Sequence, residues 1–348
     1  MNMYSPRVLS RVVNDLRVPG TFFLDKFAPF VQIEDTAEIH FDLDESKPTM
    51  APFVSPMSAG KASKHDGFNT KSFTPAYVKQ LHPHSASRVA TRMMGEQYGK
   101  PLTPKQRAAK NLKNDLSKQA RSLTYREEWM IVKAIINGAV TVVGENYPAR
   151  HVDFGRDAQL TQQLVGGLRW GEAGVSPLDK LEERARVISG ISGVSAYVVV
   201  MDHLAWGIFK KDPEVVKKIE NDARRGVVEF KAGIQLPGQG KHKFSFKGKI
   251  DDFEIWVGND SFIDPETGST VNLLPDYGLI VSGDGGEDGI IGTRCYGMIE
   301  DEKAKFKAQR YFSKSWEEEN PSVRWLMSQS APLVVPYRVN GSSFTLVR

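Results

Sequence analysis

Residues 103–138, TPKQRAAKNLKNDLSKQARSLTYREEWMIVKAIING, contain the element that decides the fold of this chain. Thr103 is a good N-cap residue, and Pro104 suits the first position of a helix. Gln106 follows the cap by three residues and completes a capping box. Gly138 supplies the stop, because glycine readily adopts the left-handed conformation that ends helices.

Apolar residues recur through this stretch at helical spacing, with lysine and arginine on the opposite side. The apolar stripe consists of Ala109, Leu112, Leu116, Leu123, Met130 and Ala134. We predict one helix over residues 104–137, which would be ~50 Å long at ~1.5 Å per residue. A helix of about three times the usual length crosses a whole domain as a strut.

The region from Pro48 to about Gly99 has no helical stripe and carries scattered proline, glycine, serine and lysine. An insertion of this kind is uncommon inside a compact domain. As a two-stranded excursion, arms of ~20 residues would reach ~65 Å. An isolated hairpin is only marginally stable in water, so we expect a neighbouring subunit to support this region.

The rest of the chain mixes helices and strands without a regular βαβ rhythm, which predicts an α+β fold. A short amphipathic helix is expected near residues 7–17, and a hairpin is expected directly after the long helix. Further helices are expected to begin at Pro177 and Pro213, where proline follows a capping residue. Further strands are expected at residues 31–43, 196–201, 243–250, 252–257 and 278–281.

Composition places the chain among proteins made in a reducing compartment. No apolar run approaches the length of a membrane span, and the first sixteen residues lack the apolar core of a signal peptide. A single cysteine, Cys295, excludes an intrachain disulfide framework. We therefore expect synthesis and assembly in cytoplasm, with no membrane partner.

Positive charge is concentrated between Lys61 and Arg126. This block holds fourteen lysines and arginines against Asp66, Glu96 and Asp115, a net charge of +11. The whole chain has a net charge of +4, so the remainder carries −7. Such a block indicates a polyanionic partner, acidic patches on copies of the same chain, or simply a solvated basic face.

The sequence offers no catalytic or metal-binding constellation. A P-loop would need glycine and a hydroxyl residue where Ser55 and Ala62 stand. The acidic stretch 284–289 lacks the spacing of a calcium loop, and His82-Pro83-His84 has no further ligands at matching spacing. Glu127-Glu128 is expected to make salt links on the helix surface. We therefore predict a protein that is not an enzyme and needs no cofactor or metal.

Six short motifs follow one another along the chain. They are Phe53-Val54-Ser55-Pro56 with Gly60 downstream, Phe73-Thr74-Pro75-Ala76-Tyr77-Val78-Lys79, Val152-Asp153-Phe154-Gly155-Arg156, Leu274-Pro275-Asp276, Tyr296-Gly297 and Ser328-Gln329-Ser330-Ala331-Pro332-Leu333. In this order, over nearly the whole chain, they resemble the lambda-like major capsid protein E family of tailed phages.

The resemblance implies the Hong Kong 97-like capsid fold, or Johnson fold, with an N-terminal arm, an extended E-loop, a peripheral P-domain on a long spine helix, and an axial A-domain. The expected divisions are 1–47 for the arm and first P-domain strand, 48–99 for the E-loop, 100–156 for the P-domain with its spine helix, 157–294 for the A-domain, 295–321 for a P-domain hairpin with a strand at 303–311, and 322–348 for the return to the A-domain.

The resemblance also implies a function. Copies would form hexamers and pentamers that close as the icosahedral head shell of a virion around double-stranded DNA, without sequence specificity. A portal is a further expected partner, and decoration proteins are common in lambda-like shells. Because no long charged helical segment precedes the arm, a separate scaffolding protein is also expected. The residues expected at the subunit interface are Phe53, Lys61, Phe73, Tyr77 and Lys79.

Two other functions fit parts of this pattern. An encapsulin-like compartment would use the same fold to enclose enzyme cargo. A sequence-independent nucleic-acid-binding protein would use the basic block, and its DNA binding would depend steeply on salt.

Overall fold

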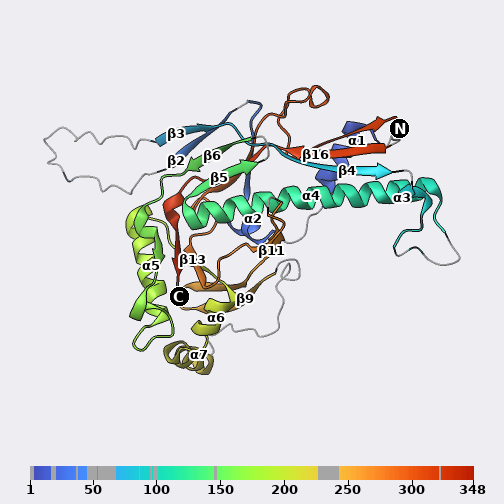
Figure 1. Cartoon of the computed structure of the whole chain (residues 1–348). Coiled ribbons are helices and arrows are strands. Elements are labelled where there is room, and N and C mark those ends of the chain that lie inside the picture. Colours follow the sequence, from blue (N-terminus) through green and yellow to red (C-terminus); the bar gives the residue numbers. More distant parts are fainter. Residues whose placement is uncertain are drawn as a thin grey trace.

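A single long helix, α4 (Pro104–Asn137), runs across most of the molecule in the computed structural model (Figure 1). The structure describes residues 4–16, 21–36, 38–44, 53, 68–85, 87–94, 96, 101–144, 147–225, 243–265, 267–320 and 323–348. The predicted capping box is present, since Thr103 Oγ1 accepts from the Gln106 N–H and Gln106 Oε1 accepts from the Thr103 N–H. Gly138 ends the helix with a φ of 68°, so the predicted bounds of the helix are confirmed.

A three-stranded antiparallel sheet and a short helix cover one side of the first half of α4. The strands, in spatial order, are β15 (Phe312–Glu318), β16 (Val323–Ser330) and β4 (Val78–Ser85). Leu9 and Val13 of α1 (Pro6–Asp15) pack with Leu112 and Leu116 of α4. The buried Gln119 amide donates to the carbonyls of Gln80 in β4 and Leu326 in β16, which fastens the sheet to the helix.

A six-stranded mixed sheet lies at the other end of the molecule, beside the end of α4 (Figure 1). In spatial order its strands are β7 (Thr161–Gln163), β18 (Ser342–Leu346), β13 (Gly278–Ser282), β8 (Val198–Met201), β10 (Phe253–Gly258) and β9 (Phe244–Ile250). The helices of this part are α5 (Pro177–Ser192), α6 (His203–Phe209) and α7 (Pro213–Arg225). Its core centres on Trp170, Phe209 and the central strands, whose residues are all buried.

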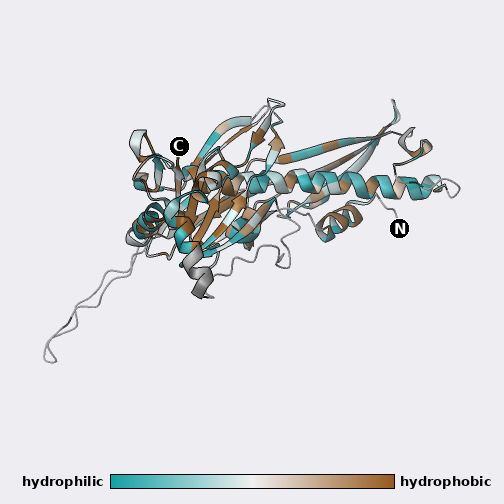
Figure 2. Cartoon of the chain, turned by 90° about the horizontal axis from the view of Figure 1, so that it is seen from below, coloured by the Kyte–Doolittle hydropathy of each residue, from teal (hydrophilic) through white to brown (hydrophobic). Residues whose placement is uncertain are grey.

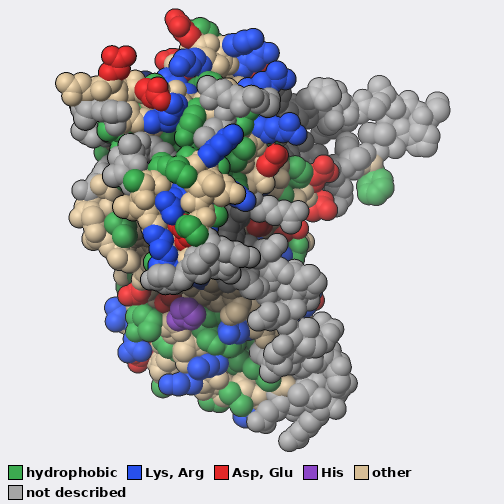
Figure 3. All heavy atoms as spheres, turned by 90° about the vertical axis from the view of Figure 1, so that its right-hand side faces the viewer, with side chains coloured by type: hydrophobic (Ala, Val, Ile, Leu, Met, Phe, Trp, Pro, Cys, Tyr) green, Lys and Arg blue, Asp and Glu red, His purple; other side chains and the backbone are tan. Residues whose placement is uncertain are grey.

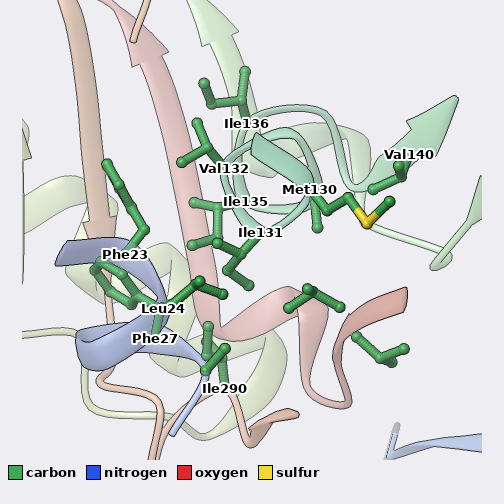
Figure 4. Close-up of a cluster of buried hydrophobic side chains, with 14 of the residues drawn as sticks. Phe23, Leu24, Phe27, Met130, Ile131, Val132, Ile135, Ile136, Val140 and Ile290 are labelled. Carbon is green, nitrogen blue, oxygen red and sulfur yellow. The ribbon is translucent and has the colours of Figure 1, made fainter. Parts of the chain in front are cut away.

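The second half of α4 forms the main core with the N-terminal helix α2 (Phe22–Phe27). Phe23, Leu24 and Phe27 of α2 lie beside the isoleucines of α4, as Figure 4 shows. Ile290 and the sheet of β1 (Phe30–Ile33), β14 (Gly292–Tyr296) and β17 (Pro332–Pro336) complete this region. The backbones approach so closely that a Cβ at Gly292 would lie 1.6 Å from the Phe27 carbonyl oxygen.

Two hairpins lie above the end of α4 in Figure 1. The first pairs β2 (Ile39–Asp44) with β3 (Phe68–Phe73) and projects from one end of the molecule. The second pairs β5 (Ala139–Gly144) with β6 (Tyr147–Asp153), as predicted from the sequence. The smaller elements are α3 (Ser87–Ala90), β11 (Ser261–Ile263), β12 (Thr270–Asn272) and the 3-10 turns 158–160, 166–168, 302–304 and 339–341.

The structure differs from three expectations about strands. The strand expected at residues 31–43 is two strands, β1 and β2, which belong to different sheets. Residues 78–85, expected in an excursion that its own chain does not support, pair along their whole length with β16. The strand expected at 303–311 is wrong, because this segment holds a 3-10 helix and the hairpin begins only at Phe312. Lys305 and Phe306 have φ values of 60° and 53°, a left-handed conformation that interrupts an extended strand.

Phe23→Ala should destabilise the unassembled subunit by about 3–5 kcal/mol, because it empties a large, fully buried site between α2 and α4. Urea denaturation followed by circular dichroism measures this change. The control is Phe306→Ala, whose ring is half exposed and whose loss should change the unfolding free energy by less than about 0.5 kcal/mol. Equal effects of the two variants would contradict the proposed role of α2.

Candidate assembly interface

The five residues predicted at a subunit interface have different surroundings. Phe53 is fully exposed, whereas Lys61 lies outside the described residues. Phe73 pairs with Ile39 in the β2–β3 hairpin and is buried in the main core. Phe73 therefore stabilises the base of the hairpin within its own subunit.

Tyr77 and Lys79 contact their own chain as well. The Tyr77 hydroxyl donates to the Met298 carbonyl at 2.8 Å and accepts from the Glu300 N–H at 3.1 Å. The Lys79 ammonium lies 5.2 Å from the centre of the Tyr77 ring, within the range of a cation–π contact. These contacts join the start of β4 to the segment after β14, and a role for the same residues between subunits remains a prediction.

One edge strand, β1, carries three exposed apolar side chains. β1 pairs with β14 on one side only and exposes Phe30, Val31 and Ile33. An edge strand offers unpaired backbone groups as well as side chains to another chain. On the face shown in Figure 3, by contrast, hydrophobic side chains are scattered among acidic and basic ones. Among the described residues, β1 and the face in Figure 3 offer small apolar contact areas.

Glu127 is fully buried where α4 passes β14 and the segment before β15. Its carboxylate accepts hydrogen bonds from the hydroxyls of Tyr296 at 3.0 Å and Tyr311 at 3.1 Å. Arg310 lies 3.5 Å from the same carboxylate. Burial raises the pKa of Glu127, and the nearby Arg310 charge opposes that shift. One carboxylate thus holds two segments of the C-terminal half against the helix.

Glu128 holds the N-terminal segment against α4 through hydrogen bonds. Its two oxygens accept from the backbone N–H groups of Phe23 at 2.7 Å and Leu24 at 2.9 Å. These N–H groups belong to the first turn of α2 and have no partner within that helix. Burial raises the pKa of Glu128 to about 8, and the negative charges of Asp25 and Asp260 act in the same direction.

The expectation that Glu127 and Glu128 make salt links on the helix surface is therefore wrong. Glu127 lies four residues after Leu123 and three before Met130, which places it on the apolar stripe, and this spacing was the missed signal. The partners could not be found in the same way, because they are more than 100 residues distant in sequence.

Potential metal ligands, the single thiol and the long helices can also be assessed within the described part of the chain. It contains no group of three His, Cys, Asp or Glu residues able to hold a metal ion. Cys295 is buried, and burial raises the pKa of its thiol to about 12, so it is a poor nucleophile. No helix among the described residues is both long enough and apolar enough to cross a membrane.

The comparisons with known proteins agree with this arrangement. The profile of the family described as phage major capsid protein E matches residues 5–344. This chain belongs to that family. The major capsid protein of Enterobacteria phage P21 is 29% identical over 305 residues, which cover 86% of each chain. The major capsid protein of Escherichia phage lambda is 28% identical over 291 residues, 82% of each chain.

Solved structures show the fold of the chain. A prophage capsid protein from Escherichia coli CFT073 superposes with a TM-score of 0.74 over 99% of both chains, at 18% identity. The capsid of Ralstonia phage GP4 gives a TM-score of 0.50 over 95% of this chain and 91% of that one, at 13% identity. The predicted Hong Kong 97-like capsid fold of the family, with mixed helix and sheet, is therefore confirmed.

Glu127→Ala should destabilise the subunit by about 3–5 kcal/mol, because Arg310 and two buried tyrosine hydroxyls lose their shared acceptor. Chemical denaturation measures the loss. The comparison variant is Tyr296→Phe, which removes one hydrogen bond and should cost about 0.5–1.5 kcal/mol. A Glu127→Ala variant as stable as the wild type would show that the carboxylate is not the common anchor.

Glu128 should make stability depend on pH. Its pKa is about 8 in the folded state and 4.5 ordinarily, so the folded state holds the proton more tightly. Its contribution to the unfolding free energy therefore falls as pH rises from about 4.5 to 8, by at most about 1.4 kcal/mol per pH unit.

Glu128→Gln cannot ionise and keeps one acceptor oxygen, so it should remove this part of the pH dependence. The unfolding free energy of the variant minus that of the wild type, measured at pH 5.5, 7 and 8.5, should increase with pH because only the wild type loses stability. A difference that stays constant across these three pH values would contradict a raised pKa at Glu128.

Proposed function

We propose that this chain is the major capsid protein of a tailed phage, and that its copies close as an icosahedral head shell around double-stranded DNA. The observation that carries the proposal is the family match over residues 5–344, together with relatives that are named major capsid proteins. Hexamers and pentamers of the chain would be the building units. A scaffolding protein, a portal and a decoration protein are the partners we propose for assembly.

Parts of the structure correspond to the roles that such a shell requires. We assign the P-domain to α4 with the β15–β16–β4 sheet, and the A-domain to the six-stranded sheet with α5, α6 and α7. The E-loop is the connection from β2 to β3, and the N-terminal arm contains α1. These assignments place β4 in the P-domain rather than in the E-loop, and only β18 of the last 27 residues returns to the six-stranded sheet.

The exposed surface favours many modest contacts over one strong contact. Phe53 on the E-loop and Phe30, Val31 and Ile33 on edge strand β1 are exposed in the isolated subunit. Burying apolar area contributes roughly 25 cal/mol per Å² before the costs of association. Contacts that each bury little apolar area allow misplaced subunits to dissociate during assembly. The closed shell then gains its stability from the large number of such contacts.

Replacing residues 45–67 with a short Gly-Ser turn should prevent closed shells while leaving the subunit folded. The replacement keeps β2, β3 and the buried Phe73 in place, so the body retains its own core. Wild type and variant are each produced with the scaffolding protein and compared by negative-stain microscopy. We expect closed particles from the wild type and soluble subunits from the variant.

Chemical denaturation provides the control for this experiment, because the variant should unfold within about 1 kcal/mol of the wild type. Normal particles from the folded variant would contradict the role of the E-loop. A wild-type chain that stays monomeric and binds DNA instead would contradict the capsid function itself.

A further inference from the structure

The exposed side of the first half of α4 carries a row of cations. We call Lys110, Lys113, Lys118 and Arg121 the α4 strip. All four side chains are exposed, and at ~100° per residue their positions fall within about 140° of the helix circumference, so they share one broad side of the helix. The opposite side packs on α1 and the three-stranded sheet, so the strip points away from the body. Figure 2, seen from below, shows this half of the helix as largely hydrophilic.

Carboxylates do not neutralise the strip. Among the described residues, none of its four cations has an ion pair. The single acidic residue of α4 before Glu127 is Asp115, which is buried. Glu96, near the start of the helix, is bound by Arg107 at 2.7 Å, and that contact lowers the pKa of Glu96 to about 2. The positive charge of the strip is therefore available to an outside partner.

The chemistry around the strip favours a polyanion over a protein. The exposed neighbours on this side of the helix are Gln106, Asn114 and Ser122, with Ala109 as the small apolar exception. Protein interfaces usually have an apolar core, often with aromatic anchors. The four exposed positions of the strip hold no aromatic residue, and Tyr125, one turn beyond Arg121, is half-buried. Lysine, arginine, amide and hydroxyl groups are the donors that contact nucleic-acid phosphates.

We infer that the α4 strip is the surface through which the subunit contacts the phosphates of double-stranded DNA, without reading bases. The inference rests on the proposed capsid function and adds which side of the subunit faces the shell interior. From Lys110 to Arg121 the helix rises ~17 Å, which spans about five base pairs of duplex. Charges that contact phosphates and not bases fit any sequence, as a shell that packages a whole genome requires.

The test compares DNA binding by the unassembled wild-type subunit with that of the variant Lys110→Gln, Lys113→Gln, Lys118→Gln and Arg121→Gln. Glutamine keeps helix propensity close to that of lysine and arginine. Fluorescence anisotropy with a 30-base-pair fragment of random sequence is measured from 50 to 200 mM salt. Four phosphate contacts predict a wild-type affinity loss of about 100-fold over this range, with the slope of log affinity against log salt reduced by about 3 to 4 in the variant.

A charge-matched control removes three exposed lysines and one exposed arginine elsewhere, through Lys210→Gln, Lys211→Gln, Lys217→Gln and Arg169→Gln. We expect this control to bind DNA within about threefold of wild type, since its cations lie outside the strip. An equal loss in both variants would overturn the inference, because binding would then follow net charge. Unchanged binding by the strip variant would overturn it as well.

Particle formation separates this inference from the proposed function. The strip variant, produced with the scaffolding protein, should still form closed shells. Loss of shells from a folded strip variant would overturn the inference, because it would show that the strip contacts protein. Absence of shells from the wild type would instead defeat the proposed function. If the fourfold variant loses helix content, the pair Lys110→Gln and Arg121→Gln gives the same test with a slope change of about 2.

Discussion

Two glutamates, buried next to each other in the second half of α4, need hydrogen-bond partners. Several distant segments of the chain have to supply these partners at the same time. A buried carboxyl group without hydrogen-bond partners is costly in either protonation state. Glu127 finds its partners in Tyr296, Tyr311 and Arg310, and Glu128 finds its partners in the first turn of α2. The N-terminal segment and the C-terminal strands must therefore both be in place before this stretch of helix is satisfied.

This requirement divides α4 into two parts with different tasks. The second half is surrounded by α2, β14 and β17 and forms the rigid centre of the subunit. The first half is held along one side by α1 and the three-stranded sheet, while its other side remains exposed and cationic. Because α4 is held along one side, its exposed side presents the same charges in every copy of the subunit.

The edge strands of the sheets also differ in how much of their surface is exposed. β4 is an edge strand that carries Pro83, which is tolerated there because an edge strand can lack one N–H donor. β1 is an edge strand with exposed apolar side chains, and the β2–β3 hairpin projects beyond the body. Such edges favour contacts between copies of the subunit, because the two buried glutamates of α4 already have their hydrogen-bond partners within each copy.

The sequence by itself determined the elements whose signals are local. The capping box, the apolar stripe and Gly138 define α4, and proline after a capping residue marks the starts of α5 and α7. The order of six motifs determined the family. Tertiary structure alone decided which groups bind Glu127 and Glu128, that residues 78–85 join β16, and that the strand expected at 303–311 is replaced by a turn. The physical reason is that capping and periodicity act over a few residues, whereas the partners of a buried carboxylate or an edge strand come from segments that only the folded chain brings together.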